Sequence, residues 1–236
     1  MRVQVPIVAP DPATWLMSQH PGDRLYWSDR DRGFTMAGVG TALTLHLSDP
    51  DKPRAFFDHA RTLLSDCSPD IRLYGGFRFD NNRPVSPQWR QFAFGQFILP
   101  RFELVARDGS ANLAANLVLP DDHDRIDDIL HHLAGLAFDP SHLQSDVARI
   151  CRRTDNPDRD LWMARVQEAV DSIHRGEMDK IVLARESRFD LEQPVDPAGL
   201  IRQLQAVASQ CFIFCFELAE GVSFLGATPE RLYRRL

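Results

Sequence analysis

Lys180 is a candidate for chemistry because of its place in the 236-residue sequence. It opens an apolar run, residues 181–184, that we predict to be part of a strand, and a charged ammonium is costly there unless it is paired or functional. Glu186 would share its strand face, so an ion pair at the strand edge is the structural alternative. Taken alone, Lys180 is better explained by that ion pair than by a catalytic role.

Glu230 is the second candidate, and it lies 50 residues after Lys180. It closes the segment Gly226-Ala-Thr-Pro-Glu230, in which the proline ends a predicted strand and a tight turn presents the carboxylate. A helix or loop cap is the structural alternative for the same glutamate. The pattern around Glu230 is unusual, but by itself it does not identify a reaction.

The histidines and glycines give weaker signals. His131 and His132 lie beside several aspartates, but on a helix they point about 100° apart, which favours a solvated helix face over a metal site. Gly38-Val39-Gly40 lacks the third glycine and the following helix of a dinucleotide-binding loop, so we predict a hairpin turn there. Gly75-Gly76 indicates a bulge or a close backbone approach. The sequence contains no nucleophile elbow or phosphate-binding loop.

The composition is that of a folded, soluble chain: hydrophobic residues make up 44% and charged residues 25%. The net charge is −6 and no block of Lys and Arg is present, which argues against nucleic acid as a partner. No segment has the length of a membrane span or the pattern of a signal peptide. The four scattered cysteines predict a cytoplasmic protein. Cys211 and Cys215, four apart in a predicted strand, cannot bond to each other.

The hydrophobic pattern predicts an α+β fold with a largely antiparallel β-sheet, because helices do not follow every strand. The proline-rich first twenty residues carry no predicted element. Predicted strands cover residues 25–27, 33–39, 43–45, 71–79, 92–99, 102–106, 111–119, 180–185, 211–218 and 222–225. Predicted helices cover residues 53–64, 126–136, 157–176 and 197–208, and the last two have the clearest start signals. Lys180 would follow the third helix, and Glu230 would follow the final hairpin.

Two segments together resemble the chorismate-utilising enzymes, the family of the isochorismate, salicylate, anthranilate and aminodeoxychorismate synthases. They are Lys180-Ile-Val-Leu-Ala-Arg185 and Phe224-Leu-Gly-Ala-Thr-Pro-Glu-Arg-Leu232. The separation of the lysine and the glutamate also resembles that of the isochorismate synthases, and the pair is far more specific than either half. Upstream, the similar segments are Tyr26-Trp27, Gly33-Phe34, Ala37–Gly40, Tyr74–Phe77, Trp89 and Leu99–Arg101.

The resemblance implies a reaction in which chorismate loses its 4-hydroxyl while water adds at C2. Lys180 would be the general base and Glu230 the general acid. These roles need a lysine pKa lowered by desolvation or nearby positive charge, and a glutamate pKa raised by burial. Family members that add ammonia carry glutamine in place of the lysine, so Lys180 favours water. The resemblance thus implies an isochorismate synthase, an isomerase; the alternatives are a salicylate synthase, another chorismate-utilising enzyme or a non-catalytic truncated remnant.

The resemblance also implies an incomplete site. Family members continue into a second half that supplies the magnesium-binding glutamates and the groups that bind chorismate, so Mg²⁺ is the expected cofactor, with its ligands beyond Leu236. We expect residues 1–155 to form an N-terminal α+β region and residues 156–236 to begin the chorismate-binding catalytic region. This fragment would be inactive alone and would expose a sheet edge at residues 232–236. Chorismate is the expected partner, and its product would enter menaquinone or siderophore biosynthesis.

Overall fold

The computed structural model describes residues 1–8, 11–47, 49, 52–80, 84–136, 138, 148–231 and 233. The chain forms two compact units: unit 1 comprises Met1–Ser145 and Asp196–Leu236, and unit 2 comprises Asp146–Val195. The division predicted from the sequence, at residues 155 and 156, concerns regions of the complete protein and stays a prediction. The predicted sheet edge at residues 232–236 lies almost entirely outside the described residues.

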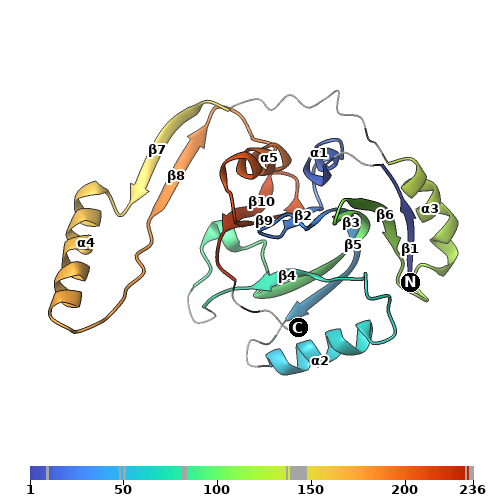
Figure 1. Ribbon diagram of the computed structural model, residues 1–236, viewed down its shortest axis with the longest axis horizontal. Coiled ribbons are helices and arrows are strands. Elements are labelled where there is room, and N and C mark those ends of the chain that lie inside the picture. Colours follow the sequence, from blue (N-terminus) through green and yellow to red (C-terminus); the bar gives the residue numbers. More distant parts are fainter. Residues whose placement is uncertain are drawn as a thin grey trace. The chain divides into compact units, whose positions relative to one another are not determined.

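Unit 1 is built on an eight-stranded antiparallel β-sheet (Figure 1). The strand order is β1-β6-β5-β3-β2-β9-β10, and β4 pairs with β5 beside this path. The strands are β1 (Arg2–Pro6), β2 (Arg24–Ser28), β3 (Phe34–Leu47), β4 (Tyr74–Phe77), β5 (Gly95–Arg107), β6 (Ser110–Asn116), β9 (Phe212–Ala219) and β10 (Val222–Thr228). The prediction of an α+β fold with a largely antiparallel sheet is therefore confirmed.

Three helices cover one face of this sheet (Figure 1). They are α1 (Pro12–Met17), α3 (Ile126–Ala134) and α5 (Pro197–Val207). The main core lies between these helices and the strands, where Trp15 of α1 and Ile201 of α5 are fully buried. A fourth helix, α2 (Pro53–Leu64), packs through Phe56 against the ends of β3 and β5. Two 3₁₀ turns, η1 (Pro87–Trp89) and η2 (His123–Arg125), complete unit 1. No helix in the described ranges is long and apolar enough to cross a membrane.

Unit 2 is a two-stranded antiparallel sheet with one helix between its strands in the chain. The strands are β7 (Ile150–Asn156) and β8 (Glu186–Leu191), and the helix is α4 (Arg159–His174). The Asp158 carboxylate caps α4 by accepting from the Leu161 N–H at 2.9 Å. Gly176 follows the helix with φ +72°, a conformation that favours glycine at a helix end. The helix predicted over residues 157–176 is confirmed, with its observed ends at Arg159 and His174.

The predicted hairpin turn at residues 38–40 is wrong, because β3 continues through it. Gly40 has φ +65°, and the register between β3 and β5 shifts between Thr41 and Leu43. This bulge lies opposite Pro100, which has no N–H to donate and which the sequence pattern treated as a break between two strands. The bulge therefore lets β3 and β5 each run as one long strand where two were predicted.

The close backbone approach predicted at Gly75 is confirmed. A Cβ atom added there would lie 2.0 Å from the backbone oxygen of Gln96 on β5. Only glycine allows β4 to pair with β5 at this spacing.

Candidate active site

Lys180 lies in unit 2, in the segment that connects α4 to β8. The predicted strand over residues 180–185 is wrong, because pairing of β8 with β7 begins only at Glu186. The Lys180 side chain is exposed, and Val182 is 80% exposed. The described residues of unit 2 do not cover this segment, and the expected burial of the lysine stays a prediction. The suggested partner Glu186 pairs instead with Arg188, at 3.3 Å.

The end of this segment nearest β8 is anchored. The Arg185 guanidinium lies over the ring of Trp162, 5.9 Å from its centroid, and 3.8 Å from the Asp155 carboxylate. Asp155 also accepts hydrogen bonds from the Ser187 hydroxyl at 2.5 Å and from Arg153 at 3.0 Å. The Ser187 hydrogen bond and then the Arg153 contact lower the pKa of Asp155, because both favour its charged form. These contacts hold the C-terminal end of the segment that carries Lys180 against α4.

Glu230 lies in unit 1, two residues after the end of β10. The strand ends at Thr228, directly before Pro229, as the sequence predicted. The Glu230 N–H donates to the Thr228 hydroxyl at 3.1 Å, and its side chain is exposed. Lys180 and Glu230 thus belong to different units, and neither has, within its own unit, the burial that its role requires. Their assignments as general base and general acid stay predictions.

A buried ion cluster that the sequence reasoning missed lies beneath α5. Arg24 of β2 is 2% exposed and donates to the carboxylates of Glu217 on β9 and Asp196, the N-cap of α5. Desolvation opposes its charge, but hydrogen bonding and attraction from the two carboxylates outweigh this and raise the pKa of Arg24. The sequence signal that could have indicated this cluster is Glu217, because it shares a strand face with the apolar Ile213 and Cys215. The cluster joins β2, β9 and α5.

The first strand is held by a similar contact. Arg2 of β1 donates to the carboxylate of Glu103 on β5 and, at 3.0 Å, to the side-chain oxygen of Asn116 on β6. Glu103 is fully buried. The contact explains why residues 2–6, which had no predicted element, form a strand at the edge of the sheet.

Asp122 forms a third buried ion pair, with Arg101. It accepts from the two terminal nitrogens of Arg101 at 2.5 and 3.1 Å and from the Val118 N–H at 2.7 Å. The Arg101 hydrogen bonds outweigh desolvation and, with the Val118 N–H, lower the pKa of Asp122. Asp122 therefore fixes the turn that leads from β6 to α3.

We expect Asp122 to make stability depend on pH. Since its pKa is lowered in the folded state, its contribution is present above the unfolded value of about 4 and is lost as the pH falls through the folded value. In urea unfolding, Asp122→Asn should be less stable than the parent at pH 7, and this difference should shrink toward pH 2. A difference that is the same at every pH would contradict this assignment.

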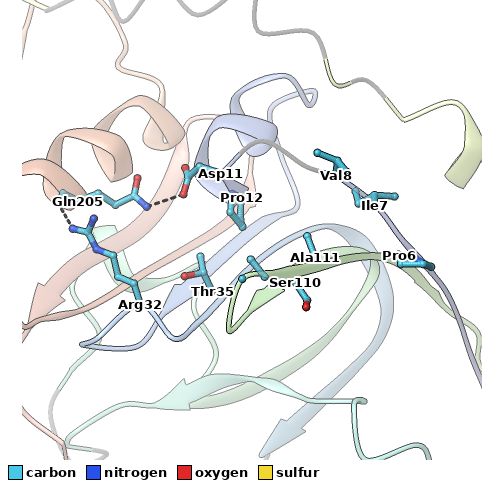
Figure 2. Close-up of a pocket in the computed structure, with 12 residues that line it drawn as sticks. Pro6, Ile7, Val8, Asp11, Pro12, Arg32, Thr35, Ser110, Ala111 and Gln205 are labelled. Carbon is cyan, nitrogen blue, oxygen red and sulfur yellow. Dashed lines mark hydrogen bonds between the residues drawn. The ribbon is translucent and has the colours of Figure 1, made fainter.

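A small hollow of about 580 Å³ lies between α1, α5 and the sheet (Figure 2). The Gln205 side chain donates to the Asp11 carboxylate at 3.3 Å, and its backbone oxygen accepts from Arg32 (Figure 2). The same side chain also donates to the Tyr26 hydroxyl at 2.8 Å. These polar groups bond to one another and join α1 and α5 to β2 and to the turn between β2 and β3. The hollow contains neither predicted catalytic residue.

The other candidate groups are as follows. All four cysteines are free. Burial raises the pKa of the Cys215 thiol to about 12, which makes it unreactive. His131 and His132 are exposed on α3. Within the described residues no group of three or more His, Cys, Asp or Glu side chains could hold a metal.

The chain thus has an antiparallel sheet covered by helices on one face, Lys180 after α4 and Glu230 after β10. Residues 1–236 match the family model described as a chorismate binding enzyme. The chain belongs to this family.

Several relatives of the chain are named as isochorismate synthases. The isochorismate synthase MenF of Bacillus subtilis is 26% identical over 234 residues, which are 92% of this chain and 49% of the relative. The salicylate biosynthesis isochorismate synthase of Pseudomonas aeruginosa is 30% identical over 220 residues, 89% of this chain and 45% of the relative. The solved structure of MenF, the menaquinone-specific isochorismate synthase from Escherichia coli, matches with a TM-score of 0.73 and 26% identity, over 100% of this chain and 51% of that one. The chain thus spans about half the length of these relatives.

Proposed function

We propose that this chain is the first half of an isochorismate synthase, an enzyme that converts chorismate to isochorismate. The observation that carries the proposal is the match of all 236 residues to the family, together with relatives named isochorismate synthase. Lys180 at the position where amine-forming members carry glutamine supports water as the nucleophile.

In the proposed reaction, Lys180 in its neutral form takes a proton from the water that adds at C2. Glu230 gives a proton to the oxygen that leaves C4, so one water enters and one departs. Both side chains are exposed in their own units, and the second half would have to cover them to shift their protonation. The expected Mg²⁺ would belong to that half, and no step is assigned to it here.

The names of the relatives include a menaquinone-specific enzyme and an enzyme of salicylate biosynthesis. We infer that isochorismate from this protein feeds one of these two routes, the second being the siderophore route. The four free cysteines support a cytoplasmic location.

We expect residues 1–236 alone to show no turnover of chorismate, because Lys180 and Glu230 lack cover and the described residues provide no metal site. Chromatography of the purified chain with chorismate and Mg²⁺ tests this, with the Bacillus subtilis relative as the positive control. Enzymatic turnover by the 236-residue chain would contradict the expectation.

The activity itself is tested on a completed enzyme, defined as residues 1–236 continued by the second half of the Bacillus subtilis relative. We expect it to form isochorismate from chorismate, and no aminated product even in excess ammonium. Anthranilate or an amino-isochorismate would place the chain in the amine-forming branch. Salicylate with pyruvate would instead make it a salicylate synthase.

A further inference from the structure

The segment that carries Lys180 has two sides that differ in exposure. The structure describes residues 180–185 in full, places no helix, turn or bend in them and runs them directly into β8 (Figure 1). Leu183 is half-buried and Ile181 is 43% exposed, while Val182 between them is 80% exposed. Side chains alternate in direction along an extended chain. The odd-numbered residues therefore lie on the more covered side, and Lys180 lies on the other side with Val182.

One face of α4 supplies this cover. Trp162 and Val166 are half-buried and Ala169 is buried, and their spacing places all three on one face of the helix. Arg185, the last odd-numbered residue of the segment, lies over the Trp162 ring at the N-terminal end of this face, 5.9 Å from its centroid. The side of the segment that carries Arg185 thus faces α4, and Lys180 points away from the helix.

Arg185 is held at a second point, on β7. Its guanidinium lies 3.8 Å from the Asp155 carboxylate, which Ser187 and Arg153 also fix by hydrogen bonds at 2.5 and 3.0 Å. Because the side-chain period of an extended chain is two, a shift of the segment by one residue would turn every side chain to the opposite side. A contact that fixes Arg185 toward α4 therefore also fixes the direction of Lys180.

We propose that Arg185 is a positioning residue for the reaction: its contacts with Trp162 and Asp155 hold the segment so that the Lys180 amine points away from α4. Arg185 touches neither water nor substrate in this proposal and acts only through Lys180. A base on an unpaired segment would otherwise have to be ordered at each turnover, which costs conformational entropy. The inference rests on the proposed function, in which Lys180 is the general base.

A cycle of variants in the completed enzyme tests the proposal. Arg185→Met should lower kcat about 10–100-fold and change KM less than about twofold, because a displacement of about 1 Å can cost that much. In a protein that already carries Lys180→Ala, it should change kcat less than about twofold, because the group that it positions is gone. Arg188→Met is the matched control. Arg188 is exposed on β8 and pairs with Glu186 of its own strand at 3.3 Å, so kcat should be unchanged.

An unchanged kcat in Arg185→Met would overturn the proposal. The same loss with and without Lys180 would also overturn it, because Arg185 would then support the fold or another group. If circular dichroism shows that Arg185→Met does not fold, Arg185→Lys takes its place in the same cycle, since lysine keeps the charge but lacks the planar guanidinium.

Hydrogen exchange gives a measurement that does not depend on activity. In the completed enzyme, the amides of residues 180–184 should exchange about fivefold or more faster in Arg185→Met than in the parent, because the segment opens more often without its anchor. Arg188→Met should exchange like the parent. Equal exchange in all three proteins would overturn the proposal. Faster exchange in Arg185→Met, in a completed enzyme that forms no isochorismate, would refute the proposed function while showing that Arg185 holds the segment.

Discussion

Lys180→Ala in the completed enzyme is expected to lower kcat about 10²–10⁴-fold with a smaller change in KM, because a general base contributes about that much to a rate. The chain contains a matched control, since Lys52 is its only other lysine and is exposed on the surface beside Asp49. Lys52→Ala should leave kcat unchanged. Steady-state kinetics on both variants, with circular dichroism to confirm folding, make the comparison.

Glu230→Gln in the same enzyme is expected to lower kcat by a similar factor, because glutamine keeps the shape of the side chain but cannot donate the proton. Steady-state kinetics of the parent and the variant measure this factor. A near-normal kcat at either position 180 or position 230 would remove that residue from the mechanism. Loss of the folded spectrum would instead favour the structural alternatives, the strand-edge ion pair and the loop cap.

Arg24→Met is expected to lower the free energy of unfolding by about 3–5 kcal/mol, because it leaves the buried carboxylate of Glu217 without its partner. Adding Glu217→Met should restore much of this loss, since methionines can fill the space that the ion pair leaves. Arg61→Met is the control: Arg61 is exposed and pairs with Asp58 at 3.3 Å, so it should cost at most about 1 kcal/mol. Urea unfolding of the four proteins provides the energies.

Equal losses in Arg24→Met and Arg61→Met would show that the buried cluster does not stabilise unit 1. A double variant that is less stable than Arg24→Met would contradict the explanation by an unpaired buried charge.

The elements that the sequence predicted well are those with local signals. α4 and α5 begin at aspartates that cap them, and β9 and β10 form the predicted final hairpin. The missed bulge at Gly40 depends on Pro100, about sixty positions later in the chain, and no local pattern reports that pairing. The cluster of Arg24 and Glu217 likewise joins residues 193 positions apart, which become neighbours only through the order of the sheet.

The candidate site was predicted less completely than the fold. The sequence identified Lys180 and Glu230 by their types and spacing, and β10 does end before Pro229 as predicted. The burial of Lys180 stays a prediction, because burial depends on what packs over a segment, and the described part of unit 2 leaves residues 180–182 exposed. The contacts of Asp155 with Arg185 and Ser187, which anchor that segment, were not predicted because β7 and β8 are short and polar.

The origin of the new hydroxyl oxygen tests the central claim most directly. The completed enzyme is supplied with chorismate in water enriched in ¹⁸O, and the product is examined by mass spectrometry. If Lys180 activates water for addition at C2, isochorismate should carry one ¹⁸O atom, at C2. The Lys180→Gln variant should form no isochorismate. Isochorismate without the label, or the same labelled product from Lys180→Gln, would contradict the claim.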